Sequence, residues 1–437
     1  WSASGKGRTV SNRDGTVIMS NSEQGNPEQG YQEQDYRTQG YQVVIVGGGM
    51  VGTALAAGLA NTHISVALIE PNEAQQPSAE DVSCFDFDTR VSAITAQSEA
   101  LLTSLGVWPL IPQARKSPYQ GMTVWDADGT GEVNFNANEL HVPCLGTIVE
   151  NREVVWALQQ VAEQADNIDI IRETVTHIDN QDEHGLTPVF LSSGKMLKPE
   201  LLVGADGALS RVKQWGEFAN CEWDYEHQAL VATIELEQSH QETAWQRFRP
   251  EGPLALLPLA GSHDRMCSIV WSTNDEECQQ LLSLNDEDFC TQLGLAFEYR
   301  LGKVLNVGPR FAFPLRQRHA KNYVVPGIAL VGDAAHTIHP LAGQGVNLGF
   351  KDVAALSEEI LRARTLGLPV GELSSLQRYQ RRRQADNLLM MAAMEGFKRL
   401  FSAEQPIIRL LRNQGMRLFN QAAAIKQHVV MQAMGLK

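Results

Sequence analysis

A short, wholly apolar segment marks the point where regular structure is first expected along the chain. Val43-Val44-Ile45-Val46 is a run of four aliphatic residues that ends in glycines, a pattern typical of a buried parallel strand. The Ala- and Leu-rich stretch from Met50 to Ala60 predicts a helix, and Ser65 to Glu70 predicts a second strand. Together these segments predict one strand–turn–helix–strand unit of about 30 residues.

The same patterns recur on both sides of a β-rich middle region. Helices are expected at 98–105 and 153–164, and buried strands at 201–204 and 328–332. Three β-rich segments with turn residues between them lie in the middle region: 229–235, 255–259 and 266–271. They predict a mostly antiparallel sheet that is inserted into the first domain.

These patterns predict an α/β fold with an α+β insertion and a helical C-terminus. Residues 20–40 are rich in Gln, Glu, Gly, Asn and Ser, so they cannot bury enough apolar surface to fold. The expected order is a disordered extension over 1–40, a discontinuous Rossmann-like domain over 41–112, 143–222 and 314–395, an inserted sheet domain over 113–142 and 223–313, and C-terminal helices over 396–437.

Composition and charge narrow the classes of partner. The chain has 437 residues, 43% of them hydrophobic, which is ample for more than one domain. Its net charge of -15 argues against nucleic acid as the main partner. From Arg378 to Lys437, however, eleven Lys and Arg stand against three acidic residues, a local charge of +8. The protein is therefore expected to have an acidic body and a basic tail.

The cysteines and the apolar runs indicate an intracellular setting without a metal site. None of the six cysteines lies in a Cys-x-x-Cys pair or at zinc spacing from a histidine. We expect free thiols in a reducing cytosol. No apolar run is as long as a membrane span.

The glycines after the first strand fit the phosphate-binding motif G-x-G-x-x-G. Gly47 permits the tight turn, Gly49 lets the backbone approach a pyrophosphate, and Gly52 lets the helix pack closely on the strand. Glu70 ends the next strand, where a carboxylate accepts ribose hydroxyls and repels a 2′-phosphate. This combination predicts a dinucleotide site and leaves FAD and NAD both open.

A second motif follows the predicted strand at 201–204. Gly204 to Ser210 places Asp206 among small residues. Such a loop suits a contact with a cofactor, and it suits a plain Asp-Gly turn equally well.

A third motif decides between the two cofactors. Gly332 and Asp333 follow a predicted strand, and the glycine-rich run 339–349 leads into a helix that contains Asp352. An Asp at a strand end can accept a ribitol hydroxyl, and open backbone N–H groups at a helix start can face a pyrophosphate or a flavin carbonyl. A long, extended cofactor needs such a distant second site, which favours FAD over NAD.

These three motifs, in this order, resemble the aromatic-ring flavin monooxygenases with the p-hydroxybenzoate hydroxylase fold. His339 to Asp352 is similar, residue for residue, to the signature of the ubiquinone-biosynthesis hydroxylases, the UbiH/UbiF/VisC/Coq6 family, and the resemblance covers residues 42–437. Five further segments resemble the VisC (UbiI) branch, which hydroxylates a 2-polyprenylphenol: 90–94, 148–151, 229–234, 267–272 and 432–436. The family's Asp-Gly motif usually ends in Arg, where this chain has Lys213, with Arg211 nearby.

The resemblance implies an enzyme whose FAD is reduced by NAD(P)H and then reacts with O2. A C4a-hydroperoxide of the flavin hydroxylates the substrate ring, here a polyprenylphenol intermediate of ubiquinone biosynthesis. By position, Gly47, Gly49 and Gly52 hold the pyrophosphate, and Glu70 holds the adenosine ribose. The other implied cofactor contacts are Arg90, Asp206, Gly332, Asp333, Pro340, Gly343, Gln344, Gly345 and Asn347.

Three residues near the third motif are candidates for the ring chemistry: His336, His339 and Pro340. A histidine beside the flavin could help to deprotonate a phenol, because its pKa lies in the useful range. The simpler interpretation is that both histidines only hydrogen-bond to backbone around the loop. The inserted sheet, near 254–259 and 311–315, is expected to cap the ring pocket or to form ordinary core.

The basic tail also has two interpretations. Residues 388–401 and 406–421 place apolar side chains at helical spacing with Arg and Lys between them. Such helices could approach an anionic membrane or a partner that carries lipid, including other ubiquinone-biosynthesis proteins. Alternatively, they pack on the FAD domain with a solvated basic face. The expected location is the cytoplasm, or the periphery of the inner membrane.

Two other functions stay open beside the leading one. The first is a sister hydroxylase that acts at another ring position or on a soluble phenol. The second is a flavin-binding scaffold inside a biosynthetic complex, with little catalysis of its own.

Overall fold

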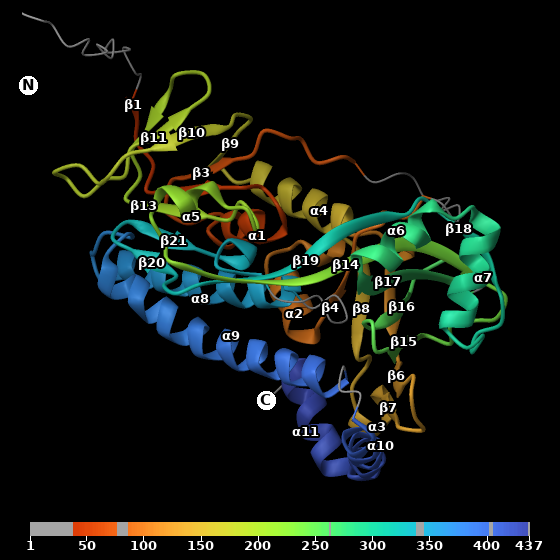
Figure 1. Cartoon of the computed structure of the whole chain (residues 1–437). Helices are drawn as coiled ribbons and strands as arrows, with labels where there is room; N and C mark the ends of the chain where they lie inside the picture. The colour runs from red at the N-terminus through yellow and green to blue at the C-terminus, as the bar shows by residue number, and fades with distance from the viewer. Residues whose placement is uncertain (1–37, 77–85, 262–263, 338–344, 402–404, 436–437) are drawn as a thin grey trace, which may run out of the picture. The chain divides into compact units, whose positions relative to one another are not determined.

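The computed structural model of the protein describes residues 38–76, 86–261, 264–337, 345–401 and 405–435. A six-stranded sheet forms its first core, in the order β20 (Val324–Val325), β21 (Ile328–Leu330), β13 (Leu201–Gly204), β2 (Val43–Val46), β3 (Val66–Ile69) and β9 (Ile168–Ile171) (Figure 1). Every neighbouring pair is parallel except β20 with β21. The predicted βαβ unit is therefore confirmed.

Helix α1 (Met50–Gly58) connects β2 to β3 and is buried along most of its length. It packs against α4 (Asn151–Glu163) and α8 (Gly345–Thr365), and α8 packs in turn on α9 (Leu373–Phe401). Small residues fill α1, so it can lie close to the sheet and to two helices at once.

A nine-stranded sheet forms the second large unit of structure. Its order is β22 (His336–Thr337), β19 (Phe311–Ala320), β14 (Asn220–Leu236), β17 (Met266–Asn274), β16 (Leu254–Pro258), β15 (Thr243–Phe248), β6 (Gly121–Asp126) and β7 (Glu132–Asn136), with β18 (Val304–Val307) also paired to β14. Only the β15–β6 pair is parallel in this sheet, so the predicted antiparallel insertion is confirmed.

The two longest strands of this sheet cross the expected domain boundaries. β14 and β19 pair from Asn220 opposite Ala320 to Val231 opposite Phe311. The expected limits at 223 and 313 therefore fall inside the paired length of these two strands. The pairing shifts register between Asp224 and His227, and it links the region that follows β13 directly to the large sheet.

Two smaller sheets and several short helices complete the described fold. One sheet contains β4 (Val91–Ile94), β8 (Gly146–Glu150) and β5 (Lys116–Tyr119), and the other contains β1 (Thr38–Gln39), β12 (Met196–Leu197), β11 (Val189–Leu191) and β10 (Val175–Ile178). The short helices are α2 (Ala96–Ser104), α3 (Ala137–Leu140) and α5 (Arg211–Trp215), with 3-10 turns at Trp108–Leu110, Gln113–Arg115 and Gly332–Ala334.

The expected disordered extension over 1–40 is corrected at its end. Thr38 and Gln39 form strand β1, which pairs in parallel with Met196 and Leu197. Backbone pairing with β12 gives these two residues regular structure. Residues 1–37 lie outside the described part of the chain.

Two helices inside the insertion were not predicted. α6 (Asp275–Ser283) and α7 (Asp286–Ala296) begin after Asn274 and Asn285, whose side chains accept backbone N–H groups of the first turn. Each has three acidic residues in that turn, which suits the positive end of a helix dipole. An Asn cap followed by three acidic residues is a recognisable sequence signal for a helix start. It does not stand out here because the surrounding hydrophobic pattern is β-rich.

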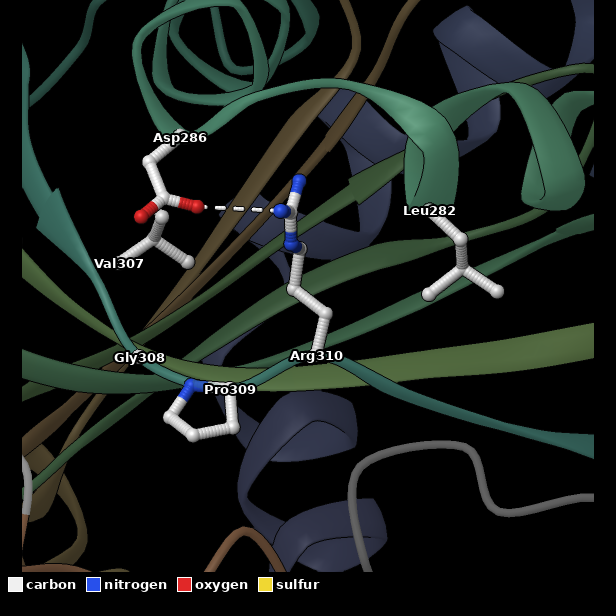
Figure 2. A pocket seen from close by; sticks show the side chains of 6 residues that line it. All are labelled: Leu282, Asp286, Val307, Gly308, Pro309 and Arg310. Carbon is white, nitrogen blue, oxygen red and sulfur yellow. Dashed lines mark hydrogen bonds and ion pairs between the residues drawn. The ribbon is translucent and has the colours of Figure 1, made fainter.

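A surface hollow lies beside these two helices (Figure 2). It is lined by Leu282, Asp286, Val307, Gly308, Pro309 and Arg310. Arg310 is held by the Asp286 carboxylate at 3.0 Å and by the Leu284 carbonyl at 2.8 Å. Its guanidinium therefore connects the start of α7 to the segment between β18 and β19. We assign no ligand to the hollow.

The C-terminal helices α10 (Pro406–Gln421) and α11 (Ala423–Ala433) are fastened to the large sheet by buried charge. Arg412 makes two hydrogen bonds to the Asp126 carboxylate, at 2.7 and 2.8 Å, and both side chains are almost fully buried. Arg412 also donates to the Phe401 carbonyl at the end of α9. One guanidinium thus joins β6, α9 and α10.

Other basic side chains of the tail also form ion pairs with acidic residues. Six of its Lys and Arg side chains form ion pairs with acids elsewhere in the chain: Arg378, Arg382, Arg383, Arg409, Arg412 and Lys426. The helices therefore pack on the body through part of their positive charge, while Arg381 and Arg417 stay exposed, so a solvated basic face on these helices stays a prediction. Among the described helices, none is both long and apolar enough to cross a bilayer.

The Arg412 pair yields a stability prediction. Replacing Arg412 with Met leaves the buried Asp126 carboxylate without its cation, so the free energy of unfolding should fall by about 3–5 kcal/mol. The matched control is Arg409→Met, which removes the more exposed pair with Asp128 and should cost less than about 1 kcal/mol. Denaturant midpoints of the two purified variants measure the difference, and equal losses would contradict the anchoring role of Arg412.

Candidate cofactor site

The glycine turn after β2 is shaped by close backbone contacts. Gly47 has a φ of +105°, and a Cβ there would lie 2.5 Å from the Ala205 carbonyl oxygen. A Cβ at Gly52 would lie 1.9 Å from the Gly47 carbonyl oxygen. Neither position accepts a side chain, so both glycines are required for the turn itself, before any ligand is considered.

Gly49 differs because the space beside it is open. A Cβ at Gly49 would meet no atom of the described residues within 4 Å. Gly49 is also the N-cap of α1, and no side chain caps this helix start. An uncapped helix N-terminus beside open space is the arrangement that receives a pyrophosphate. The turn therefore fits the phosphates of a dinucleotide.

Glu70 lies against the same turn. Its Oε2 accepts a hydrogen bond from the Gly48 N–H at 2.8 Å, and its Oε1 accepts one from the Asn72 N–H at 3.0 Å. The carboxylate is therefore fixed at the end of β3, beside the helix start, which is the place expected for a contact with the adenosine ribose.

The Asp206 loop combines a turn role with an unused oxygen. The Asp206 Oδ2 accepts the backbone N–H groups of Arg211 at 2.7 Å and Val212 at 3.2 Å, at the start of α5. Gly207 follows with a φ of +78°. The Asp206 Oδ1 is buried and has no hydrogen-bond partner among the described residues. Asp206 therefore forms the predicted Asp-Gly turn, and its Oδ1 remains available to accept a hydrogen bond from a ligand.

Lys213 occupies the place where the resemblance implies Arg. It is buried, and its Nζ has no hydrogen-bond partner among the described residues. Burial, reinforced by the charge of Arg318, lowers the pKa of this amine, whereas Asp206 and Asp333 oppose that effect. The ammonium therefore lies within electrostatic reach of both acidic loops.

Asp333 stands in the turn that follows β21. The residue has exposed surface, but the surrounding protein keeps water from its carboxyl and so raises the pKa, and nearby His336, Arg90 and Lys213 partly offset that rise. The structure thus brings Asp333 near two cations that are distant in sequence. Such a carboxylate is suitably placed to accept hydroxyl groups of a ligand.

Arg90 is held at the edge of the large sheet. Its carbonyl accepts the Asn151 N–H at 2.9 Å, and its guanidinium lies 5.8 Å from the centre of the Phe313 ring on β19. The preceding loop is tied down by Glu150, which accepts the Asp88 N–H at 2.6 Å and pairs with Arg115 at 3.0 Å. Arg90 therefore lies where the cofactor loops meet the large sheet.

Of the residues predicted around the flavin ring, the structure describes Asn347 and Gly345 but not those of the preceding loop. Asn347 is buried, and its amide bonds to the Ala93 carbonyl at 2.7 Å and the Thr95 N–H at 3.1 Å, so its side chain fastens α8 to β4. Gly345 begins α8, and a Cβ there would meet no described atom within 4 Å. The remaining residues predicted in this loop lie outside the described part of the chain: His339, Pro340, Gly343 and Gln344.

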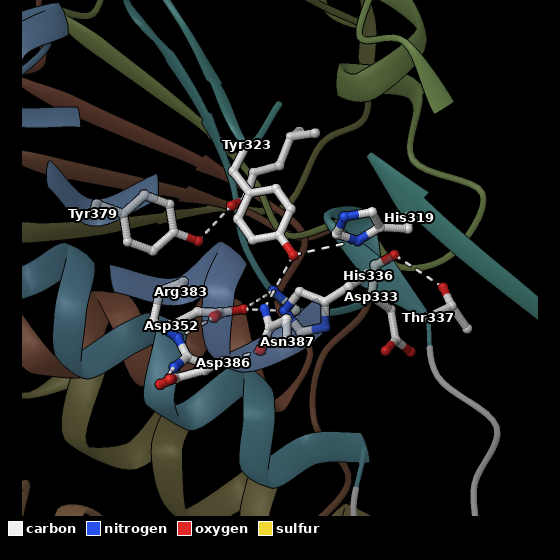
Figure 3. Close-up of polar contacts among 12 residues, drawn as sticks. His319, Tyr323, Asp333, His336, Thr337, Asp352, Tyr379, Arg383, Asp386 and Asn387 are labelled. Carbon is white, nitrogen blue, oxygen red and sulfur yellow. Dashed lines mark hydrogen bonds and ion pairs between the residues drawn. The ribbon is translucent and has the colours of Figure 1, made fainter. Parts of the chain in front are cut away.

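His336 does not bond as the simpler interpretation expected. Its Nε2 lies 2.5 Å from the Asp352 Oδ2, so the ring is paired with a buried carboxylate rather than with backbone. The residues that surround this pair form a network that sequence reasoning missed (Figure 3): His319, Tyr323, Asp352, Tyr379, Arg383 and Asn387. Of these, the sequence marks Asp352 only as part of a motif, because its side-chain partners His336 and Arg383 come from β22 and α9.

Taken together, these contacts define the class of site. Three loops after parallel strands converge at one sheet edge, with a phosphate-binding helix start and a fixed acid for a ribose, as in proteins that bind an extended dinucleotide. Comparison with known proteins then identifies the family. A family model described as "FAD binding domain" matches residues 40–387.

Two curated relatives cover nearly the whole chain. The 3-demethoxyubiquinol 3-hydroxylase of Escherichia coli (strain K12) is 39% identical over 90% of this chain and 98% of the relative. The ubiquinone biosynthesis monooxygenase COQ6 of Xenopus tropicalis is 35% identical over 89% of this chain and 92% of the relative. The chain therefore belongs to the family of FAD-dependent monooxygenases that contains these ubiquinone-biosynthesis hydroxylases, and FAD is its cofactor.

Solved structures support the fold assignment. The p-nitrophenol 4-monooxygenase PnpA of Pseudomonas putida superposes with a TM-score of 0.73, covering 90% of this chain and 97% of that chain at 17% identity. PqsL of Pseudomonas aeruginosa, titled a probable FAD-dependent monooxygenase, gives 0.70 over 86% and 99% at 18% identity. The predicted fold class is thereby confirmed, whereas membership of the VisC branch stays a prediction.

The contrast between Gly49 and Gly52 can be tested by substitution. Gly49→Ala should leave the thermal midpoint of the apoprotein nearly unchanged, because the added methyl meets open space, but it should weaken FAD binding about tenfold or more by blocking the pyrophosphate. Gly52→Ala should instead destabilise the protein, because its methyl collides with backbone.

Gly396→Ala is the matched control, since a Cβ there also meets open space but lies on α9. FAD affinity is measured by quenching of flavin fluorescence on titration into apoprotein. FAD binding by Gly49→Ala that equals that of Gly396→Ala would place the pyrophosphate elsewhere.

Proposed function

We propose that the protein is an FAD-dependent aromatic-ring monooxygenase that hydroxylates a polyprenylphenol intermediate of ubiquinone biosynthesis, with NAD(P)H and O2 as co-substrates. The observation that carries the proposal is the meeting of the cofactor loops with the large sheet, where Arg90 contacts Phe313. The relatives named as ubiquinone-biosynthesis hydroxylases support the substrate class.

FAD, when bound and reduced, supplies the activation of O2 and the transfer of one oxygen atom to the ring. The residues of the chain bind and orient the reactants. The helix start at Gly49 receives the pyrophosphate and Glu70 the adenosine ribose, while Asp333 accepts hydroxyls of the ribitol chain. Arg90 and Lys213 supply positive charge beside Asp333.

The substrate ring would lie between the Asp333 turn and the large sheet. Phe313, beside Arg90, is half-buried and offers an aromatic face at this junction. For removal of the phenol proton, His336 has only Nδ1 to offer, because its Nε2 is bonded to Asp352. His339 remains the other candidate base from the sequence, and Pro340 is a candidate for lining the flavin ring.

The protein is expressed in bacterial strains that each lack one ubiquinone hydroxylase. Rescue of ubiquinone synthesis tests the proposed function, and the identity of the rescued strain separates it from the sister activity. The VisC assignment expects rescue of the strain that lacks the early 2-polyprenylphenol hydroxylase, with loss of its accumulated precursor in quinone profiles. Rescue of a strain blocked at a different ring position would overturn that branch and favour the sister enzyme. Rescue by a variant that cannot bind FAD, such as Gly49→Ala if it fails the titration above, would favour the scaffold.

We also propose that the C-terminal helices meet the lipid surface that carries the substrate, through apolar rather than basic side chains. Leu411 and Leu418 are each 65% exposed and seven residues apart on α10, and Ile425 on α11 is 60% exposed. Positions seven apart share one helix face. Since Arg409, Arg412 and Lys426 are paired with acids of the body, insertion of leucine side chains suits this face better than attraction to anionic lipid.

Vesicle flotation tests this contact. The double variant Leu411→Gln/Leu418→Gln should lose most of its binding to phosphatidylcholine vesicles, while Leu366→Gln, which changes a residue 59% exposed after α8, should bind as the parent does. Binding should change little with added salt, because screening weakens charge attraction and not apolar insertion. Binding that needs anionic lipid and disappears in high salt would contradict the proposal.

A further inference from the structure

A single buried carboxylate is bonded to both ends of the turn that carries Asp333. Asp352 is fully buried on α8. Its Oδ2 accepts the Gly332 N–H at 3.0 Å and meets His336 Nε2 at 2.5 Å. Gly332 directly precedes Asp333, and His336 follows it by three residues, so Asp352 holds the turn on both sides of Asp333. Figure 3 shows Asp352 beside His336, with Asp333 on the same turn.

The turn between them needs glycine at its first position, because a side chain there would be strained and crowded. Gly332 has a φ of +58°, and a Cβ there would lie 3.1 Å from Val51 on α1. Just before it, the Leu330 carbonyl accepts a hydrogen bond from the Tyr379 hydroxyl at 2.7 Å. The turn is therefore anchored from α8 and α9 and packed against α1, with Asp352 as its charged anchor.

The charge of Asp352 is sustained by its surroundings. Burial by itself would raise the pKa of this carboxyl, but His336 and Arg383 outweigh burial and hold the pKa below its usual range. Arg383 donates from Nε to the Asp352 Oδ1 at 2.8 Å, and its other nitrogens bond to Asp386 and Asn387. The anion is thus present wherever the protein is folded near neutral pH.

The same network reaches the large sheet. Asn387 donates to the Tyr323 hydroxyl at 3.2 Å, and that hydroxyl lies 3.4 Å from Nδ1 of His319 on β19. His319 is also paired across strands with His336. The network therefore connects the Asp333 turn with the strand that carries Phe313 into the large sheet.

We infer that Asp352 is a positioning residue for FAD: acting through Gly332 and His336, it fixes the turn so that Asp333 presents its carboxylate to the ribitol chain. This inference rests on the proposed flavin site at Asp333. Asp352 itself is buried behind the turn and touches no reacting group. Its loss should therefore weaken and misplace the flavin, beyond any effect on folding.

The test compares Asp352→Asn with Asp386→Asn. Both side chains pair with Arg383, but Asp386 is 67% exposed and has no contact with the turn, so it is the matched control. Asp352→Asn should raise the dissociation constant for FAD about 10- to 100-fold, the usual cost of removing a group that orients a direct ligand contact. It should also broaden the long-wavelength absorption band of the bound flavin. Asp386→Asn should change neither by more than about twofold.

Because Asp352→Asn also removes a buried partner of Arg383, a second variant separates positioning from folding. His336→Gln leaves the Asp352–Arg383 pair intact and should still weaken FAD binding, with the altered flavin band, at nearly unchanged thermal stability of the apoprotein. If the two residues act through one turn, the double variant should bind FAD about as well as Asp352→Asn alone, because their effects do not add.

Parent-like FAD affinity and spectrum in folded Asp352→Asn, or in His336→Gln, would overturn the inference and leave Asp352 with a purely structural role. Failure of the unaltered protein to bind FAD would instead defeat the proposed function. The titration of the parent protein therefore distinguishes the two failures.

Discussion

The close approach of three backbone loops at one sheet edge is the constraint on which the rest of the structure depends. Gly47 meets the Ala205 carbonyl, and Gly52 meets the Gly47 carbonyl, at distances that exclude any Cβ. Gly349 on α8 similarly leaves room for Val51, since a Cβ there would lie 2.5 Å from the Val51 side chain. Without these small residues, α1 could not lie between the sheet and α8, and the loops after β2, β13 and β21 could not share one edge.

Electrostatics then fixes what packing brings together. Buried carboxylates recur at the joints between segments distant in sequence: Asp352 between α8 and α9, Glu150 beneath the Arg90 loop, and Asp126 beneath α10. Each is paired with an arginine, so removing the arginine leaves an uncompensated buried charge. Two of these pairs, Arg383 with Asp352 and Arg412 with Asp126, join the basic tail to the acidic body that the composition indicates.

The sequence predicts those parts of the site that are continuous along the chain. The strand at 43–46, the glycine turn and Glu70 follow from a short local pattern; the structure has the strand and puts Glu70 against the turn, while their contacts with the cofactor stay predictions. The antiparallel insertion follows from β-rich segments, although β14 and β19 extend past its expected limits because cross-strand pairing continues through 220–224 and 316–320.

Residues that act through partners from other elements could not be predicted in this way. The local sequence around Lys213 does not predict a buried amine without a hydrogen-bond partner among the described residues. Arg383 is one of several basic residues on a predicted helix, and the pattern does not distinguish it from the others. Asn347 stands inside a recognisable motif, yet its amide is used to hold β4 rather than turned toward a ring. Such roles depend on tertiary contacts, which periodicity does not encode.

If these loops hold FAD as proposed, one atom of O2 should reach a polyprenylphenol ring. The test incubates the purified FAD-loaded protein with NAD(P)H, a polyprenylphenol and isotopically labelled O2, and follows the product by mass spectrometry. The product should gain one labelled oxygen atom, and NAD(P)H should be consumed only when FAD is bound. Oxidation of NAD(P)H that never labels the phenol, with all the oxygen released as peroxide, would contradict the proposed function.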